Sequence, residues 1–394
     1  MMSVFTSLTF LIDRIYTQKV KGIISTFVFP SAYVIMEYIV ILTNPSGSYG
    51  TLAHTQTSLP LIQVISITGI WGLIFLITWT ASIINWLWDN SFEENKLKQG
   101  LLFYGIPFLF FIIYGQIRIQ KEIQGSTVRV ASINIEKAHL RYHMSENADS
   151  IDVRTSSNFL LKCEVAASAD AKIVFGAEAI VTISESAEKG FIEKAKITAH
   201  KNNVYFGIPM CIIPKGYPQN RPENKIVWIS PKGEIVFTYH KSRPTPGEGN
   251  YGDGIIKYFD SPYGRISSAI CFDMDFPDLI NQVRNMNIDI MLVPANDWEE
   301  IAPYHTFVAS FRAIEHGFNM VRSASKGLSA AFNYKGQIIS AQDFFTSDSD
   351  ILYSDVPVKG HKTAYSVIGD SFAWLSILFF VIMSVIFLKS YVIK

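Results

Sequence analysis

Long apolar stretches lie near both ends of the chain, whereas the middle alternates short apolar runs with polar segments. A helix that crosses a bilayer needs about 20 predominantly apolar residues. Some stretches reach or approach this length, and we predict them to be transmembrane helices: 22–42, 61–88, 101–117 and 371–388. An earlier apolar segment, 3–12, is too short to cross and is expected to be a half-helix or the stump of a longer segment.

From about residue 118 to residue 370 the pattern predicts alternating strands and helices. Short runs rich in β-branched and aromatic residues are typical of strands, and apolar residues at helical spacing are typical of amphipathic helices. The predicted strands are 128–134, 172–175, 203–213, 226–230, 235–239, 265–270, 288–294, 320–324, 328–332 and 337–340. The predicted helices are 151–168, 189–200, 278–284 and 305–319. Such an alternation indicates a layered α/β domain.

The pattern divides the chain into three regions. We expect an N-terminal transmembrane helical region (1–117), an extracytoplasmic α/β domain (118–370) and a C-terminal transmembrane helix (371–394). Only 17% of the residues are charged, against about a quarter in an ordinary soluble domain, and the deficit lies at the two ends. The formal net charge of zero gives no reason to expect a nucleic-acid partner.

Positively charged residues beside the predicted spans indicate orientation, because such residues favour the cytoplasmic side. They flank the first full span, lie between the second and third, and follow the last: Arg14, Lys19, Lys21, Lys96, Lys98, Lys389 and Lys394. We therefore expect a multi-pass protein of the cell (inner) membrane with its α/β domain on the periplasmic, or extracytoplasmic, side. Within the first span, Glu37 either faces a partner or cavity or lies near the membrane interface.

The three cysteines form neither a CxxC pair nor a zinc-binding spacing. Cys163 and Cys211 lie in apolar segments and are expected to pack in the core. Cys271 differs, because it follows the predicted strand 265–270 and precedes Pro277, which opens a helix. A cysteine on such a turn is presented at the sheet edge, and a nearby helix N-terminus favours its thiolate. Cys271 is therefore a candidate nucleophile, the alternative being a small buried thiol.

Two further strand ends carry residues suited to acid–base and electrostatic roles. Glu178 follows the apolar strand 172–175, where burial raises the pKa of a carboxyl group and allows it to act as a base. The predicted strands 226–230 and 235–239 form a hairpin, and Lys241 lies at its end. A loop stiffened by Pro and Gly then leads to a second carboxylate, Glu248. Taken singly, a strand-end Glu or Lys is most simply explained as a solvated side chain.

In this order within one α/β domain, Glu178, Lys241 and Cys271 resemble the Glu-Lys-Cys triad of the nitrilase, or carbon–nitrogen hydrolase, superfamily. The resemblance implies an αββα nitrilase-type sandwich domain inserted between transmembrane α-helices. The spans and several strings resemble one branch, the apolipoprotein N-acyltransferases: 29–37, 69–75, 295–298, 312–315, 321–327 and 334–339. The chain departs from that family's usual pattern in having fewer helices before the first full span, Ala177 where a proline is usual, and a shorter loop from Lys241 to Glu248.

The resemblance also implies roles for these residues. Cys271 would attack an acyl carbonyl, and Glu178 would take the thiol proton and later pass it to the leaving group. Lys241, with the backbone N–H near Phe272, would hold the oxyanion, and Glu248 would orient Lys241 or the incoming amine. No cofactor and no metal is expected.

The same resemblance implies the substrates. A fatty acyl group would move from a phospholipid donor to the N-terminal amine of a diacylglyceryl lipoprotein, through a cysteine thioester, beside the lipid bilayer. Phe272, Trp298 and Tyr304 would bind substrate at a lipid-facing rim, the alternative being ordinary aromatic packing. His305 is expected to cap or pack a helix, and Arg312 and Glu315 are expected to form a structural ion pair.

Two other functions remain open from the sequence. The first is a membrane-tethered nitrilase-type amidase that acts on a small amide, because the thioester chemistry would be the same. The second is a catalytically inactive scaffold, since fold alone does not guarantee activity.

Overall fold

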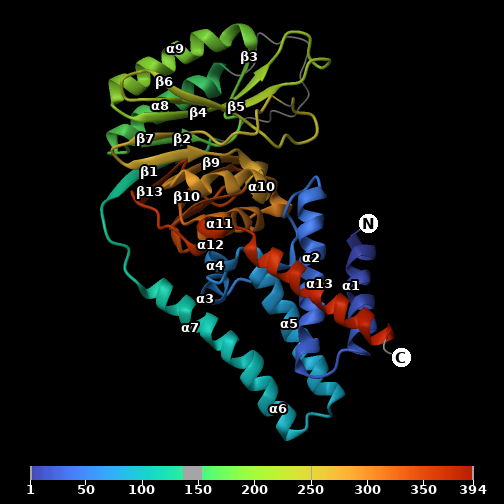
Figure 1. Ribbon diagram of the computed structural model, residues 1–394. Coiled ribbons are helices and arrows are strands. Elements are labelled where there is room, and N and C mark those ends of the chain that lie inside the picture. Colours follow the sequence, from blue (N-terminus) through green and yellow to red (C-terminus); the bar gives the residue numbers. More distant parts are fainter. Residues whose placement is uncertain (1, 136–152, 250, 393–394) are drawn as a thin grey trace. The chain divides into compact units, whose positions relative to one another are not determined.

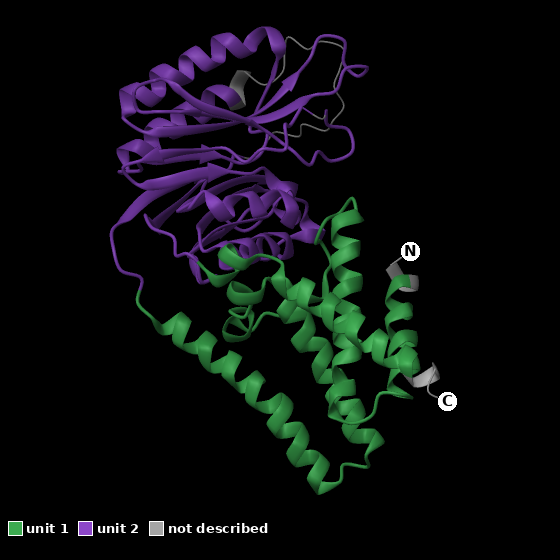
Figure 2. Ribbon diagram, viewed as in Figure 1, with its two compact units in different colours: residues 1–122, 363–394 green, residues 123–362 purple. Residues whose placement is uncertain are grey.

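The computed structural model describes residues 2–135, 153–249 and 251–392 (Figure 1). The first residues of the predicted helix 151–168 lie outside this range. The chain forms two compact units, which are Met1–Glu122 together with Thr363–Lys394, and Ile123–Lys362 (Figure 2). We describe each unit by itself.

The unit Ile123–Lys362 contains two sheets. The first has the order β13-β1-β2-β4-β5-β6, with β3 paired to β4, and consists of β1 (Thr127–Ile133), β2 (Ile173–Gly176), β3 (Val181–Ser184), β4 (Tyr205–Ile213), β5 (Glu223–Ile229), β6 (Ile235–His240) and β13 (Ile351–Pro357). The second has the order β12-β11-β10-β9-β8-β7 and consists of β7 (Tyr258–Ser261), β8 (Gly264–Ser268), β9 (Ile290–Asn296), β10 (Asn319–Ser325), β11 (Leu328–Phe332) and β12 (Ile338–Asp343). The helices are α8 (Val153–Ser168), α9 (Glu185–Asn202), α10 (Pro277–Ile280) and α11 (Tyr304–His316).

Strand β1 shows why the sheets are covered on both faces. Val128 and Val130 belong to the core between the two sheets, whereas Ala131 and Ile133 belong to the core under α8 and α9. Successive side chains of a strand point to opposite faces, so a strand that is apolar on both sides must lie between two layers. The same hydrophobic cluster extends to Ala309 and Ala313 of α11, the helix layer of the second sheet. The layers are helix, sheet, sheet, helix, and the predicted αββα sandwich is confirmed (Figure 1).

The other unit is mainly helical. Its helices are α1 (Met2–Thr17), α2 (Val28–Thr43), α3 (Leu59–Ile62), α4 (Ile65–Thr68), α5 (Ile70–Asp89), α6 (Glu94–Gly100), α7 (Ile106–Gln120), α12 (Ala364–Ile368) and α13 (Ser371–Val392). Among the described residues, four helical stretches are long and apolar enough to cross a membrane: Ile23–Thr43, Ile70–Asp89, Glu94–Gln120 and Ser371–Lys389. The chain is therefore a membrane protein by the length and composition of its helices.

The predicted span 61–88 is wrong at its start, because the structure breaks it into α3, α4 and α5. Gly69 separates α4 from α5 with a φ of 65°, a conformation that only glycine adopts at little cost. A Cβ at this position would lie 2.4 Å from the ring of Tyr365. Apolar character alone could not reveal the break, since the residues on both sides are apolar.

The structure also shows the outcome of the predictions for segment 3–12 and for Glu37. The segment 3–12 is part of a longer helix, α1. Glu37 is buried, and its Oε1 accepts a hydrogen bond from the Leu52 backbone N–H at 3.3 Å. Glu37 therefore faces a partner within its own unit, as one of the two alternatives expected.

In the sandwich, the sequence analysis missed β3, β7 and β13. β3 and β7 have only four residues each, which is short for a reliable pattern, and β13 has an irregular pattern of exposed and buried positions. The predicted helix 278–284 is also wrong, because α10 ends at Ile280 and a 3-10 turn, Asn281–Asn285, follows. Strand β8 ends at Ser268, two residues before the predicted end.

Candidate active site

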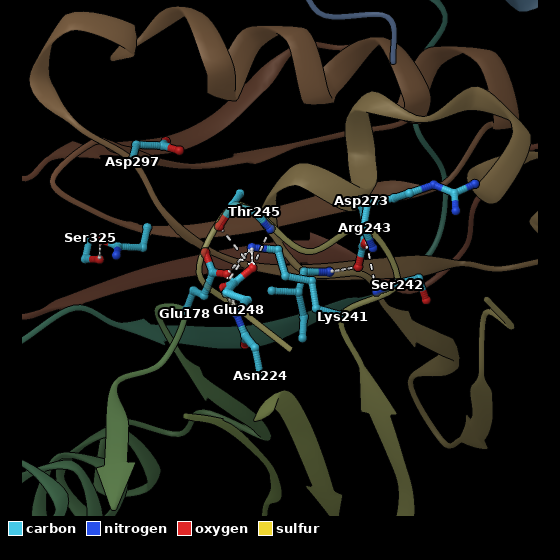
Figure 3. Close-up of polar contacts among 12 residues, drawn as sticks. Glu178, Asn224, Lys241, Ser242, Arg243, Thr245, Glu248, Asp273, Asp297 and Ser325 are labelled. Carbon is cyan, nitrogen blue, oxygen red and sulfur yellow. Dashed lines mark hydrogen bonds and ion pairs between the residues drawn. The ribbon is translucent and has the colours of Figure 1, made fainter. Parts of the chain in front are cut away.

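Lys241 follows β6 directly and is the centre of a buried ion cluster (Figure 3). Its Nζ lies 2.8 Å from Glu178 Oε1 and 3.0 Å from Glu248 Oε2. Lys241 is 3% and Glu178 4% exposed, and charges so far from water are tolerated only when they are paired. Three of the predicted site residues therefore lie together, as one cation against two carboxylates, and we call them the Lys241 cluster.

These contacts set the charge of the cluster. Burial lowers the pKa of Lys241, but the neighbouring negative charges, that of Glu178 first, outweigh burial and raise this pKa above its ordinary value. Burial acts on Glu248 too, yet Lys241 and the Thr245 backbone N–H hold the pKa of Glu248 below its usual range. At neutral pH Lys241 is a fixed cation and Glu248 a fixed anion.

Asn224, on β5, bridges the two carboxylates, and the sequence analysis missed it. Its Nδ2 donates to Glu178 Oε1 and to Glu248 Oε1, both at 2.7 Å. The antiparallel pairing of β5 and β6 brings it there, because the Lys241 N–H donates to the Asn224 carbonyl at 2.9 Å. The local signal was weak, since Asn224 lies among polar residues at the start of its strand.

Cys271 begins the 3-10 turn Cys271–Asp275 with a φ of 49°. This left-handed conformation is strained for any residue but glycine, and such strain is concentrated at functional sites. Burial, and then the charge of Glu178, raises the pKa of Cys271 well above that of an ordinary thiol, against the opposing effects of Lys241 and Arg322. The net shift is opposite to the one expected from a nearby helix N-terminus. The sulfur is a neutral thiol whose proton must be removed by a base.

Asp273 lies two residues after Cys271, and it connects the turn Cys271–Asp275 to the backbone that follows Lys241 (Figure 3). Its carboxylate accepts the backbone N–H of Ile270 at 3.0 Å, that of Ser242 at 3.1 Å and that of Arg243 at 2.7 Å. These residues adjoin Cys271 and Lys241 in sequence, so one buried side chain fixes both turns. The sequence analysis singled out neither Asp273 nor its neighbour Asp275.

Asp275 belongs to a second buried group of charges, which also contains Asp297, His305 and Arg322. His305 Nε2 is 2.8 Å from Asp275 Oδ2, and His305 Nδ1 is 2.7 Å from Asp297 Oδ1. Arg322 Nη2 donates to Asp297 Oδ1 at 3.0 Å. We call these four residues the His305 network. The interpretation of His305 as a capping or packing residue is wrong, because both of its ring nitrogens contact carboxylates.

Cys271, Asp297 and His305 offer three donor atoms within 4.8 Å of one another, a set that zinc accepts. The guanidinium of Arg322 lies at the same place, however, since its Nη2 is 2.9 Å from His305 Nδ1 as well as bonded to Asp297. A fixed positive charge there opposes the binding of a cation. We therefore assign Asp297 and His305 to the His305 network and not to a metal site with Cys271.

The three aromatic residues predicted for substrate binding differ in exposure. Phe272 is half-buried, with its ring centroid 5.1 Å from that of Phe276. Trp298 is 56% and Tyr304 37% exposed. The rings of Trp298 and Tyr304 thus offer free surface, and the role of all three at a lipid-facing rim remains a prediction.

Residues predicted to be structural behave as expected. Arg312 and Glu315 of α11 form an ion pair at 2.6 Å, and both are buried. Cys163 and Cys211 are also buried, and neither forms a disulfide with another described residue. These predictions are confirmed.

Comparison with known proteins places this geometry in a family. The sequence profile described as Carbon-nitrogen hydrolase matches residues 128–364, and the one described as Apolipoprotein N-acyltransferase N-terminal domain matches residues 1–83. Apolipoprotein N-acyltransferase 2 of Treponema denticola is 25% identical over 417 residues, covering 91% of this chain and 75% of that protein. The apolipoprotein N-acyltransferase of Geobacter metallireducens is 24% identical, covering 90% of this chain and 72% of that protein.

A solved structure supports the fold. A mutant of the Nesterenkonia AN1 amidase from the nitrilase superfamily superposes with a TM-score of 0.51 at 14% identity, covering 64% of this chain and 97% of the amidase. At this identity the likeness concerns the fold alone, and the family rests on the sequence profiles. The chain therefore belongs to the carbon–nitrogen hydrolase family, in the branch of the apolipoprotein N-acyltransferases.

Proposed function

We propose that this chain is a membrane N-acyltransferase that moves a fatty acyl group from a phospholipid to the N-terminal amine of a lipoprotein. The observation that carries the proposal is the Lys241 cluster beside the buried thiol of Cys271. The four apolar helical stretches support a lipid donor, because a small soluble amide requires no membrane helices. The names of the relatives support the same reaction class.

In the first half-reaction, the Glu178 carboxylate takes the Cys271 proton as the sulfur attacks the ester carbonyl of the phospholipid. The carbonyl electron pair moves onto oxygen, and Lys241 with the Phe272 backbone N–H holds the resulting oxyanion. The oxyanion then collapses and the carbon–oxygen bond to glycerol breaks. The glycerol oxygen takes the proton from Glu178, and a lyso-phospholipid leaves behind an acyl thioester.

In the second half-reaction, the amine of the lipoprotein attacks the thioester carbonyl and gives a proton to Glu178. Collapse of this second oxyanion breaks the carbon–sulfur bond, and the sulfur takes the proton back. The product is an amide. Glu248 does not exchange a proton in this scheme, because Lys241 and the Thr245 N–H keep it ionised. Its role is to hold Lys241 in position.

We also propose how the chain is arranged in the membrane. The regions 1–117 and 371–394 would cross the inner membrane several times, and the domain 118–370 would lie on the periplasmic side, where a diacylglyceryl lipoprotein acceptor is found. The excess of Lys and Arg beside the predicted spans supports this orientation. Phe272, Trp298 and Tyr304 would contact the acyl chains.

The test is single-turnover acylation of the full-length protein in detergent with phospholipid. Intact-mass measurement should show one added acyl group on Cys271 and an equal amount of lyso-phospholipid. Addition of a diacylglyceryl lipopeptide should then remove the acyl group and yield an N-acylated peptide. Cys271→Ala should abolish both steps, while Cys163→Ala, which removes a buried thiol on α8, should retain them.

Each failure has a distinct meaning. Turnover of small amides without lyso-phospholipid would replace the proposal by an amidase. Acylation of the Cys271→Ala protein would remove Cys271 from the mechanism. If neither lipid nor amide is turned over by a folded protein, the chain is a catalytically inactive scaffold.

A further inference from the structure

The His305 network contacts the nucleophile independently of the Lys241 cluster. Asp275 is the last residue of the 3-10 turn that Cys271 begins, so a bond to Asp275 acts directly on the strained turn. Asp297 follows β9, His305 lies on α11 and Arg322 lies on β10. The network thus joins the Cys271 turn to three other elements of the second sheet and its helix layer.

The neighbours of His305 favour its protonation. A neutral ring has one N–H, and its other nitrogen would direct a lone pair at a carboxylate oxygen less than 3 Å away. Arg322 Nη2, 2.9 Å from Nδ1, favours a lone pair on that nitrogen, but two carboxylates face the ring against one guanidinium. Burial and the charge of Arg322 lower the pKa of His305, but Asp275 and Asp297 outweigh them and raise it above the ordinary value. The network then contains two cations and two carboxylates, with a net charge of zero.

The sulfur lies within reach of this charge balance. The Cys271 sulfur, an Asp297 oxygen and a His305 nitrogen are all within 4.8 Å of one another. Arg322 and Asp297 act on the thiol in opposite directions, Arg322 favouring the thiolate and Asp297 opposing it. Exposure of the four network residues does not exceed 4%, so solvent screens these charges little.

We propose that the His305 network is a positioning device for the nucleophile, in which a protonated His305 clamps the Cys271 turn to the end of β9 and balances the charge that surrounds the sulfur. His305 does not exchange a proton with substrate. It keeps Asp275 and Asp297 from presenting a net negative charge to a thiol that must become a thiolate. The inference rests on the proposed nucleophilic role of Cys271.

The test measures the alkylation of Cys271 by iodoacetamide in the full-length protein in detergent at pH 8.5, followed by peptide mass spectrometry. Below the thiol pKa, this rate is proportional to the thiolate fraction, and one pKa unit is a tenfold change. His305→Gln removes a positive charge and should slow alkylation about tenfold. Asp297→Asn removes a negative charge and should accelerate it about tenfold. Glu178 and Lys241, which also act on the sulfur, are unchanged in both variants.

The opposite signs separate charge balance from simple loosening. A network that served only to pack the turn would open the site when damaged, and both variants would then react faster. His316→Gln is the matched control, because His316 is a buried histidine on the same helix, and it should leave the rate within about twofold. Equal effects of His305→Gln and His316→Gln, or faster alkylation in His305→Gln, would overturn the proposal.

If His305→Gln does not fold, the pH profile of Cys271 alkylation in Asp297→Asn distinguishes charge balance from loosening of the turn. Charge removal shifts the profile to lower pH with an unchanged plateau, whereas loosening raises the plateau. This readout needs no acyl donor. If the alkylation rates change with the predicted signs but the protein forms no acyl adduct, the positioning role of the network stands and the acyltransferase proposal fails. Acylation with unshifted alkylation would do the reverse.

Discussion

The two carboxylates of the five-residue Cys271 turn serve different surroundings. Asp273 bonds to the backbone beside Lys241, whereas Asp275 bonds to His305. The Lys241 cluster has one cation for two carboxylates, and the His305 network has two cations for two. An excess of carboxylate leaves a base available to take a proton, and a balanced group holds geometry without competing for that proton. The difference supports the proposal that proton transfer belongs to the first group and positioning to the second.

The largest expected effect comes from removing the only cation of the Lys241 cluster. Lys241→Met would leave Glu178 and Glu248 facing each other without a counter-charge. We expect the acylation rate to fall about 10³-fold, because an oxyanion donor is lost, and the free energy of unfolding to fall by about 3–5 kcal/mol, because buried charge is left unpaired. Mass-detected acylation and thermal unfolding measure the two losses.

The control for this change is Lys257→Met. Lys257 pairs with Asp253 at 3.1 Å, and both side chains are at least one-third exposed, so the change should cost no more than about 1 kcal/mol. A Lys241→Met protein that still forms the acyl adduct at more than a tenth of the wild-type rate would contradict the role of the cluster.

Asp273 belongs to neither the Lys241 cluster nor the His305 network, and it makes the free energy of unfolding depend on pH. Burial raises the pKa of Asp273 to about 6, although its hydrogen bonds oppose that effect. The unfolded chain releases this proton near pH 4. Between about pH 4 and 6 the folded protein therefore binds more protons, and its stability falls as pH rises, by about 3 kcal/mol in total from this group.

The measurement is the difference in thermal unfolding between wild type and Asp273→Asn across this range. The advantage of wild type should shrink as pH rises from 4 to 6. Glu248→Gln supplies the opposite sign, because the folded pKa of Glu248 is lowered, so the stability that ionised Glu248 contributes is lost as pH falls through the acid range. Parallel slopes for the two variants would show that the pH effect is not specific to these groups.

Asn224 tests whether the two carboxylates need their bridge as well as their cation. Asn224→Leu keeps the approximate size and removes both 2.7 Å hydrogen bonds. We expect a loss of stability of about 2 kcal/mol and about a tenfold slower acylation, since buried acceptors lose a donor but keep Lys241. Asn202→Leu is the matched control, because this amide on α9 bonds to the Thr198 carbonyl of its own helix. An unchanged acylation rate would restrict Asn224 to a structural role.

The local pattern could predict strands, helices and a layered α/β domain. The order of Glu178, Lys241 and Cys271 along that domain resembled a known family, and the resemblance implied the αββα sandwich. Apolar runs of strand length predict strands, and a reactive side chain directly after such a run predicts a position at a sheet edge. The structure brings Lys241 into contact with Glu178 and Glu248, as expected. Their catalytic roles remain predictions.

Other parts of the site depend on pairing between distant segments. Asn224 reaches Lys241 through the pairing of β5 with β6, and His305 reaches Asp275 only when α11 packs near the Cys271 turn. Likewise β13 joins the first sheet beside β1, more than 200 residues away in sequence. The local sequence does not predict such contacts between distant segments. For this reason His305, which is buried between two carboxylates, was predicted to be a helix cap.

The smallest expected effect concerns Arg243. Its backbone lies next to the Lys241 cluster and contacts Asp273, but its side chain pairs with a different residue. Its backbone N–H bonds to Asp273, whereas its guanidinium pairs with the partly exposed Asp278 at 2.5 Å and lies 5.0 Å from the ring of Phe276. Arg243→Ala keeps the backbone bond and should cost no more than about 1 kcal/mol of stability. Acylation should stay within about threefold, because the pair with Asp278 is a surface one. Arg243→Pro removes the N–H and should cost more stability than Arg243→Ala, because Asp273 loses one of its backbone donors. The comparison separates the contribution of the turn's backbone from that of its surface charge.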